Sequence, residues 1–249
     1  MFRKIRLNTI IMIIISLGIA WGLKYHYSHS TSDDLCWILA PTAYLVEMTG
    51  DMTFEREINT GYVDHESGII IAPACAGVNF MIIAFCLSAY TGLKKIKTTT
   101  RQFVWVMVSI AGSYIYTLLV NTFRISLSIY SIRTDFLQAW FSRETVHLFE
   151  GVLVYFIFLL IYNSLLNRII NPDHSSNTGK PSIMIKRFLL PLSFYLSFTL
   201  LLPVLNHGGF PQGNGFTEYT FIILLGCAIV FALFFLLKAC CHYCAVKVK

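Results

Sequence analysis

Three residues whose types suit acyl-transfer chemistry occur in separate parts of the chain: Cys75, Arg124 and His147. A cysteine thiolate can attack a carbonyl carbon, a histidine can move the thiol proton, and an arginine can stabilise the developing oxyanion. Cys75 comes just before one long apolar segment, Arg124 just after the next, and His147 at the start of a third. If these segments cross a membrane, the three residues fall at one level and can converge on one site.

Each of these residues also has a purely structural explanation. Cys75 can be a small packing residue, or it can form a disulfide with Cys36 if both lie on the oxidising outer side. Arg124 can reach up to lipid phosphates and His147 can simply lie at the interface. A single catalytic site at one depth in the membrane explains the presence of all three residues together. Asn121, one helical turn before Arg124, is a further candidate for substrate binding.

The composition is that of a membrane protein. Of the 249 residues, 56% are hydrophobic and 13% are charged, which is too apolar for a soluble domain. Six segments approach the roughly 20 apolar residues that a helix needs to cross a bilayer. They are Ile5–Leu23, Gly77–Leu93, Phe103–Val120, Leu148–Leu166, Phe188–Leu205 and Tyr219–Leu237. We therefore predict an all-α polytopic membrane protein with about six transmembrane helices.

Shorter segments between the first four spans predict a small cap. Leu35–Met48 is apolar but short and contains Pro41, so we interpret it as re-entrant or interfacial. Asp51–Ala74 is polar, and its pattern predicts strands around Thr53–Ile58 and Gly68–Ala72. Asn121–Val146 is amphipathic and is predicted to be an outer loop.

The basic residues predict the orientation. With a cytoplasmic N-terminus and six crossings, 14 of the 19 Lys and Arg residues lie inside, and Asp173 is the one acidic residue there. Because basic loops stay cytoplasmic, both termini are predicted to be cytoplasmic and the candidate site to lie outside the plasma membrane. The net charge of +6 therefore reflects topology, and no arginine–aromatic pattern indicates nucleic-acid binding.

Three regions follow from this pattern. Residues 1–170 form a membrane catalytic core, residues 171–182 ("NPDHSSNTGKPS") a cytoplasmic connector, and residues 183–249 two further helices with a short tail. The tail holds Cys240, Cys241 and Cys244 in one tight cluster. A structural zinc site normally uses separated ligand pairs, so we predict no metal there or elsewhere.

Short motifs around the candidate residues resemble those of the exosortase/archaeosortase family. They are "ACAG" at Ala74–Gly77, "NTFR" at Asn121–Arg124 and "HLFEG" at His147–Gly151, in the family's order of cysteine, arginine and histidine. The resemblance extends from about Ile69 to Leu166 and implies a polytopic cysteine transpeptidase. It implies substrates that are exported proteins with a C-terminal sorting signal and a transmembrane helix, and an acceptor such as a lipid or polysaccharide.

The residue roles follow from their chemistry. Cys75 attacks the peptide carbonyl, His147 transfers the proton, Arg124 stabilises the oxyanion, and Asn121 orients Arg124 or adds a hydrogen bond. No cofactor is required. Glu144 and Glu150 lie within one turn of His147 and can orient it, but such glutamates more often face water or headgroups, so they are left out of the predicted site.

Two other functions compete with this hypothesis. A small polytopic transporter can also place Arg124 and His147 along a polar path, although it would need charges near the bilayer midplane, where these spans are nearly uncharged. A non-catalytic membrane assembly protein would not need a cysteine, an arginine and a histidine at one depth.

Overall fold

The computed structural model describes residues 7–134, 142–170, 181–201 and 214–247. Within these ranges, five helices are long and apolar enough to cross a membrane. They are α1 (Leu7–His29), α3 (Val78–Leu93) together with the turn before it from Pro73, α4 (Thr99–Thr134), α5 (Arg143–Ile170) and α8 (Asn214–Lys247). The protein is therefore an all-α polytopic membrane protein, as its composition predicts.

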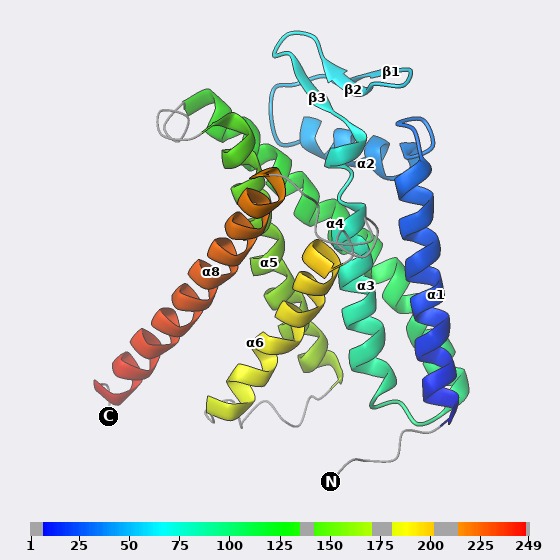
Figure 1. Ribbon diagram of the computed structural model, residues 1–249, viewed down its shortest axis with the longest axis vertical. Coiled ribbons are helices and arrows are strands. Elements are labelled where there is room, and N and C mark those ends of the chain that lie inside the picture. Colours follow the sequence, from blue (N-terminus) through cyan, green and yellow to red (C-terminus); the bar gives the residue numbers. More distant parts are fainter. Residues whose placement is uncertain (1–6, 135–141, 171–180, 202–213, 248–249) are drawn as a thin grey trace.

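The long helices run between two ends of the molecule, and a small sheet covers one of these ends (Figure 1). Helix α1 begins and α8 finishes at the opposite end (Figure 1). The fifth predicted span, Phe188–Leu205, corresponds to part of α6 (Pro181–Leu196) and to the π-helical turn Ser197–Leu201 that continues it. Their apolar part, Arg187–Leu201, is shorter than a full span, and residues 202–205 lie outside the described ranges, so the number of six crossings stays a prediction.

Helix α3 is the centre of the bundle. It packs against α1, α4, α5 and α6, and almost every residue from Phe80 to Leu93 is buried. A helix that is apolar on all sides is stable only when neighbours cover all of it, which fits this central place. One core cluster joins α3 to α1, α2 and α4, and a second joins it to α5, α6 and α8.

Helix α4 is much longer than the predicted span Phe103–Val120. Its 36 residues end at Thr134, so the first part of the predicted outer loop Asn121–Val146 is helical, and that prediction was wrong. Buried residues Ile125, Ser128 and Ile129 continue the helical period of the packed face. At 1.5 Å per residue the helix is about 54 Å long, so it must tilt or extend beyond the roughly 30 Å hydrocarbon core.

The cap consists of three short antiparallel strands in the order β1–β2–β3. Their bounds are Glu55–Glu57, Gly61–Asp64 and Ile69–Ile71. Strands β1 and β3 fall inside the two predicted strand regions, whereas β2 was not predicted, because its four residues lie between turn residues and show no extended alternation. The pairing of Tyr62 with Ile71 and of Val63 with Ile70 sets the register of β3.

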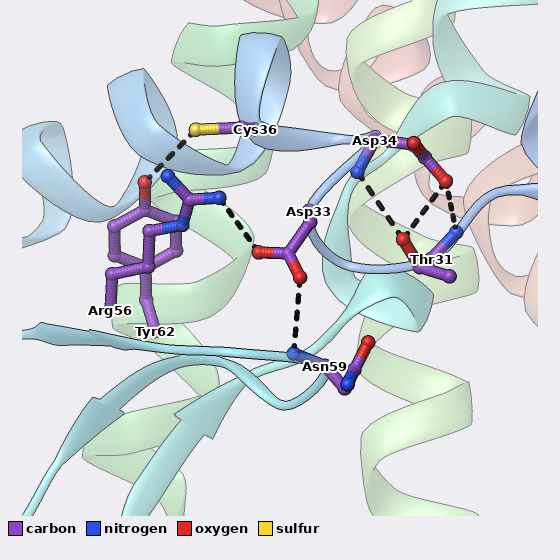
Figure 2. A network of polar contacts seen from close by, with 7 residues as sticks. All are labelled: Thr31, Asp33, Asp34, Cys36, Arg56, Asn59 and Tyr62. Atoms are coloured by element: carbon purple, nitrogen blue, oxygen red, sulfur yellow. Dashed lines mark hydrogen bonds and ion pairs between the residues drawn. The ribbon is translucent and has the colours of Figure 1, made fainter.

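A polar network attaches the cap to the segment that follows α1 (Figure 2). Asp33 accepts hydrogen bonds from Nη2 of Arg56 at 2.7 Å and from the backbone N–H of Asn59 at 3.3 Å. The Sγ atom of Cys36 lies 3.4 Å from the hydroxyl of Tyr62. Cys36 opens helix α2 (Cys36–Glu47), whose 12 residues reach only about 18 Å and are too short to cross a bilayer.

The C-terminal regions differ in part from the predicted division. The first ten residues of the predicted connector 171–182 lie outside the described ranges, and its last two belong to α6. Helix α8 continues through Lys247, so the cysteines Cys240, Cys241 and Cys244 belong to this helix and not to a separate tail.

Candidate active site

Cys75 lies in a tight turn that precedes α3. Pro73–Cys75 forms one 3-10 turn, in which the N–H of Cys75 donates to the carbonyl of Ala72 at 2.8 Å. Helix α3 begins only at Val78, three residues after Cys75, so the cysteine lies before the first turn of that helix.

Gly77 allows the turn to approach α4 closely. Its φ of +72° lies in the left-handed region, and a Cβ atom there would lie 3.1 Å from Cγ of Asn121. The Nδ2 atom of Asn121 donates to the carbonyl oxygen of Cys75 at 2.6 Å. Asn121 is fully buried. Asn121 therefore holds the backbone of Cys75. One of its two predicted roles was to orient Arg124, and in the structure it does not do so directly.

Tyr155 of α5 connects Asn121 to Arg124. Its hydroxyl donates to Oδ1 of Asn121 at 2.8 Å and accepts a hydrogen bond from Nη1 of Arg124 at 3.4 Å. The guanidinium carbon also lies 5.2 Å from the centre of the Tyr155 ring. Tyr155 was not among the predicted site residues, because an aromatic residue in an apolar helix has no feature that separates it from ordinary core.

Arg124 and His147 are in direct contact. Nη2 of Arg124 lies 2.9 Å from Nε2 of His147, and the Oγ atom of Ser128 lies 2.8 Å from Nδ1 of the same ring. An arginine can only donate, so Nε2 accepts and Nδ1 carries the proton that is donated to Ser128. Ser128 was also missed, although its place four residues after Arg124 is the spacing that puts two side chains on one helix face.

The burial of Arg124 does not fit a residue that reaches up to lipid phosphates. Its exposed fraction is 8%, and its Nε atom is buried without a hydrogen-bond partner among the described residues. A Cβ atom on Gly151 would lie 3.1 Å from this Nε, so the glycine makes room for the guanidinium. A buried, permanently charged group with an unpaired N–H is costly, and an oxygen atom of a bound molecule would satisfy it.

Cys75 and His147 line one cavity of about 420 Å³. Its apolar wall includes isoleucines of α4, and its other polar lining residues are Ser67, Ser128, Ser131, Glu144 and Glu150. Glu150 is buried, and its Oε2 atom has no hydrogen-bond partner among the described residues. Neither glutamate belongs to the site predicted from the sequence, since carboxylates near a membrane surface are usually solvated.

Cys75 shares the cavity with His147 but, among the described residues, its side chain makes no hydrogen bond to His147 or to Arg124. The Arg124 guanidinium and the Cys75 thiol are nevertheless close enough to interact electrostatically. Cys36 and Cys75 are both free thiols, so the alternative of a disulfide between them is not realised. In the same described ranges, no group of three or more His, Cys, Asp or Glu residues is arranged to hold a metal ion.

The chain matches a protein-family model described as Transmembrane exosortase (Exosortase_EpsH) over residues 10–163. This region extends from α1 to α5 and includes the cap and every residue of the site described above. No curated protein and no solved structure matches the chain. Because the family match covers more than half of the chain and all of the site, this protein belongs to the transmembrane exosortase family.

Proposed function

We propose that this protein is a cysteine transpeptidase that cleaves exported proteins near a C-terminal sorting signal and transfers the new C-terminus to an acceptor. The observation that carries the proposal is the shared cavity of Cys75 and His147, with Arg124 hydrogen-bonded to that histidine. Family membership supports a transpeptidase-like role in the membrane. The nucleophile, the reaction and the substrate are the parts that we propose.

In the first step, the Cys75 thiolate attacks the scissile carbonyl carbon, and the carbonyl electrons move onto oxygen. His147 accepts the thiol proton, which requires Nε2 to leave Arg124, since Nε2 is the unprotonated nitrogen in this structure. We propose that the released Nη2 of Arg124 then donates to the oxyanion and that the positive charge of the buried guanidinium stabilises it. When the C–N bond breaks, His147 returns the proton to the leaving amine and a thioester remains on Cys75.

In the second step, the hydroxyl or amine of an acceptor, such as a lipid or polysaccharide, attacks the thioester carbonyl. His147 takes the acceptor proton and passes it to the departing Cys75 sulfur, so the thiol is regenerated. Attack by water instead would give hydrolysis. The same three side chains serve both steps because both pass through a tetrahedral intermediate with one oxyanion.

The test replaces the proposed nucleophile. Cys75→Ala and Cys75→Ser should remain inserted at normal membrane levels and should abolish processing of a sorting-signal substrate, because a serine hydroxyl lacks the acidity of a thiol. Cys36→Ala is the matched control, since Cys36 is another free, partly buried thiol near the cap. Near-normal processing by Cys75→Ala would remove the nucleophile and with it the proposed function.

We also propose that both termini are cytoplasmic and that the cavity opens on the outer face. The distribution of basic residues supports this, as does the start of α1 and the end of α8 at the end of the molecule opposite the cap (Figure 1). In intact cells, a membrane-impermeant thiol reagent should label Cys75. The cysteines of α8 should react only after permeabilisation, and their labelling in intact cells would contradict this orientation.

A further inference from the structure

Strand β3 has one unpaired edge. In the sheet order β1–β2–β3, β3 is paired on one side by β2, and no described strand pairs its other side. Among the described residues, no backbone hydrogen bond outside the sheet involves Ile69, Ile70 or Ile71. A strand edge of this kind presents free N–H and C=O groups to any extended chain that approaches it.

This unpaired edge borders the candidate active-site cavity. Five consecutive residues, Ser67 to Ile71, line the cavity together with Cys75 and His147. Ile69, Ile70 and Ile71 form β3, and successive side chains of a strand point to opposite faces. A cavity that touches all three residues therefore runs along the backbone edge and not along one face. Ile70 is 49% exposed although it is apolar, so the described part of the chain leaves about half of this residue uncovered.

The cavity wall formed by α4 is suited to binding the side chains of a peptide. Ile125, Ile129 and Ile132 of α4 line it and are spaced at one helical turn, so they form an apolar strip facing the strand. Cys75 comes four positions after Ile71, a distance of at most about 14 Å in an extended chain. A peptide lying along β3 therefore reaches the Cys75 thiol within about four of its own residues.

We infer that the substrate binds by adding an extended strand to the free edge of β3, with alternate side chains against the isoleucine strip of α4. This inference rests on the proposed function and names how the cavity recognises its substrate: through the main chain of an extended peptide segment beside the scissile bond. Backbone hydrogen bonds supply affinity in such complexes, and pockets for alternate side chains supply specificity. A folded or helical segment has no free main-chain groups to offer and is excluded.

The experiment uses the full-length protein in detergent micelles and a library of short peptide vinyl sulfones, which react covalently with a nucleophilic thiol. Mass spectrometry measures the labelling rate of Cys75, with Cys36 as the internal reference thiol. For the fastest peptide, each backbone amide is replaced in turn by an ester, which removes the N–H donor without adding bulk. The protein itself is unchanged, so no variant can fail through misfolding.

We expect the labelling rate to fall at alternate positions, by roughly 3- to 10-fold per lost hydrogen bond, and to change little at the positions between them. This period of two follows from the alternating direction of N–H groups along a strand. A uniform profile along the peptide would overturn the strand-addition inference and leave the proposed function intact. If no library member labels Cys75 faster than Cys36, both the proposed function and this inference fall.

Discussion

The Nη2 atom of Arg124 lies 2.9 Å from Nε2 of His147, in a contact that joins α4 to α5 beside the cavity. While this contact is made, Nε2 is unprotonated, because arginine has only donors. In the proposed mechanism, the atom that accepts the thiol proton is therefore unprotonated but is occupied by a different donor. We propose that binding of a substrate oxygen to Arg124 releases the ring, so that proton transfer is coupled to the presence of substrate.

The first prediction concerns the shape of the Arg124 side chain. Arg124→Lys should lower kcat/KM for substrate processing by about 10²- to 10³-fold, the usual effect of losing an oxyanion donor. Lysine keeps the charge but loses the planar fork that contacts His147 and Tyr155 together. Processing is compared at matched membrane levels, with Arg56→Lys in the cap as the control. Full activity of Arg124→Lys would indicate that only a positive charge is needed.

The second prediction concerns the hydrogen bond between Ser128 and His147. Ser128→Ala removes the partner of Nδ1, so the ring loses the contact that fixes its orientation, and processing should fall by roughly 3- to 10-fold. His147→Ala should have a larger effect, about 10²- to 10⁴-fold, because it removes acid–base catalysis altogether.

The control for Ser128 lies on the same helix. Ser109 of α4 is buried and its Oγ lies 2.9 Å from Oγ of Ser88, so Ser109→Ala also loses a buried hydroxyl contact. It should retain normal processing because it is outside the site. Equal losses in Ser109→Ala and Ser128→Ala would show that the effect comes from general stability and not from the orientation of His147.

The third prediction concerns the hydroxyl of Tyr155. Tyr155→Phe removes the group that joins Asn121 to Arg124, and we expect processing to fall by about tenfold as Cys75 and the guanidinium lose their fixed relation. Tyr116→Phe is the matched control, since the Tyr116 hydroxyl donates to the carbonyl of Phe158 at 2.7 Å outside the site. Both variants lose a hydrogen bond within the bundle, and only Tyr155→Phe should lose activity. If the two variants behave alike, Tyr155 has a structural role alone.

The fourth prediction concerns the pH dependence of cap attachment. The hydrogen bond from Arg56, and then that from the N–H of Asn59, lowers the pKa of Asp33 below its ordinary value of 3.8. A depressed folded-state pKa adds stability that is fully present above the unfolded pKa and is lost as pH falls through the folded pKa. Attachment of the cap should therefore be constant from neutral pH to about pH 4 and weaken only in stronger acid.

Hydrogen exchange of the strand amides as a function of pH measures this attachment. In the Asp33→Asn variant, the backbone amide hydrogens of the cap should exchange faster at neutral pH. The increase in exchange rate in acid that is due to protonation of Asp33 should disappear. Asp34 and Asp64 also have lowered pKa values, from bonds to Thr31 and Ser67 respectively, so their steps should remain in the variant. An unchanged acid profile in Asp33→Asn would show that Asp33 does not link protonation to cap attachment.

Much of the architecture is a local property of the chain. Hydropathy and length predict α1, α3, α5 and α8 because crossing a bilayer requires about 20 apolar residues, whatever the neighbours are. The prediction of an outer loop at Asn121–Val146 was wrong because hydropathy declines where α4 leaves the most apolar region, while the helix continues through Thr134. There, packing against the rest of the bundle supports the helix without a strongly apolar sequence.

The sequence by itself determined the class of the protein and the candidate residues Cys75, Arg124 and His147, since their types and their places beside apolar segments are visible without any partner. Only the tertiary structure decided how they are held. Ser128, Tyr155 and Asn121 act through side chains that meet across α4, α5 and the turn of Cys75. Which helix faces meet depends on rotation and packing of whole helices, a property of the assembled bundle that no local pattern carries.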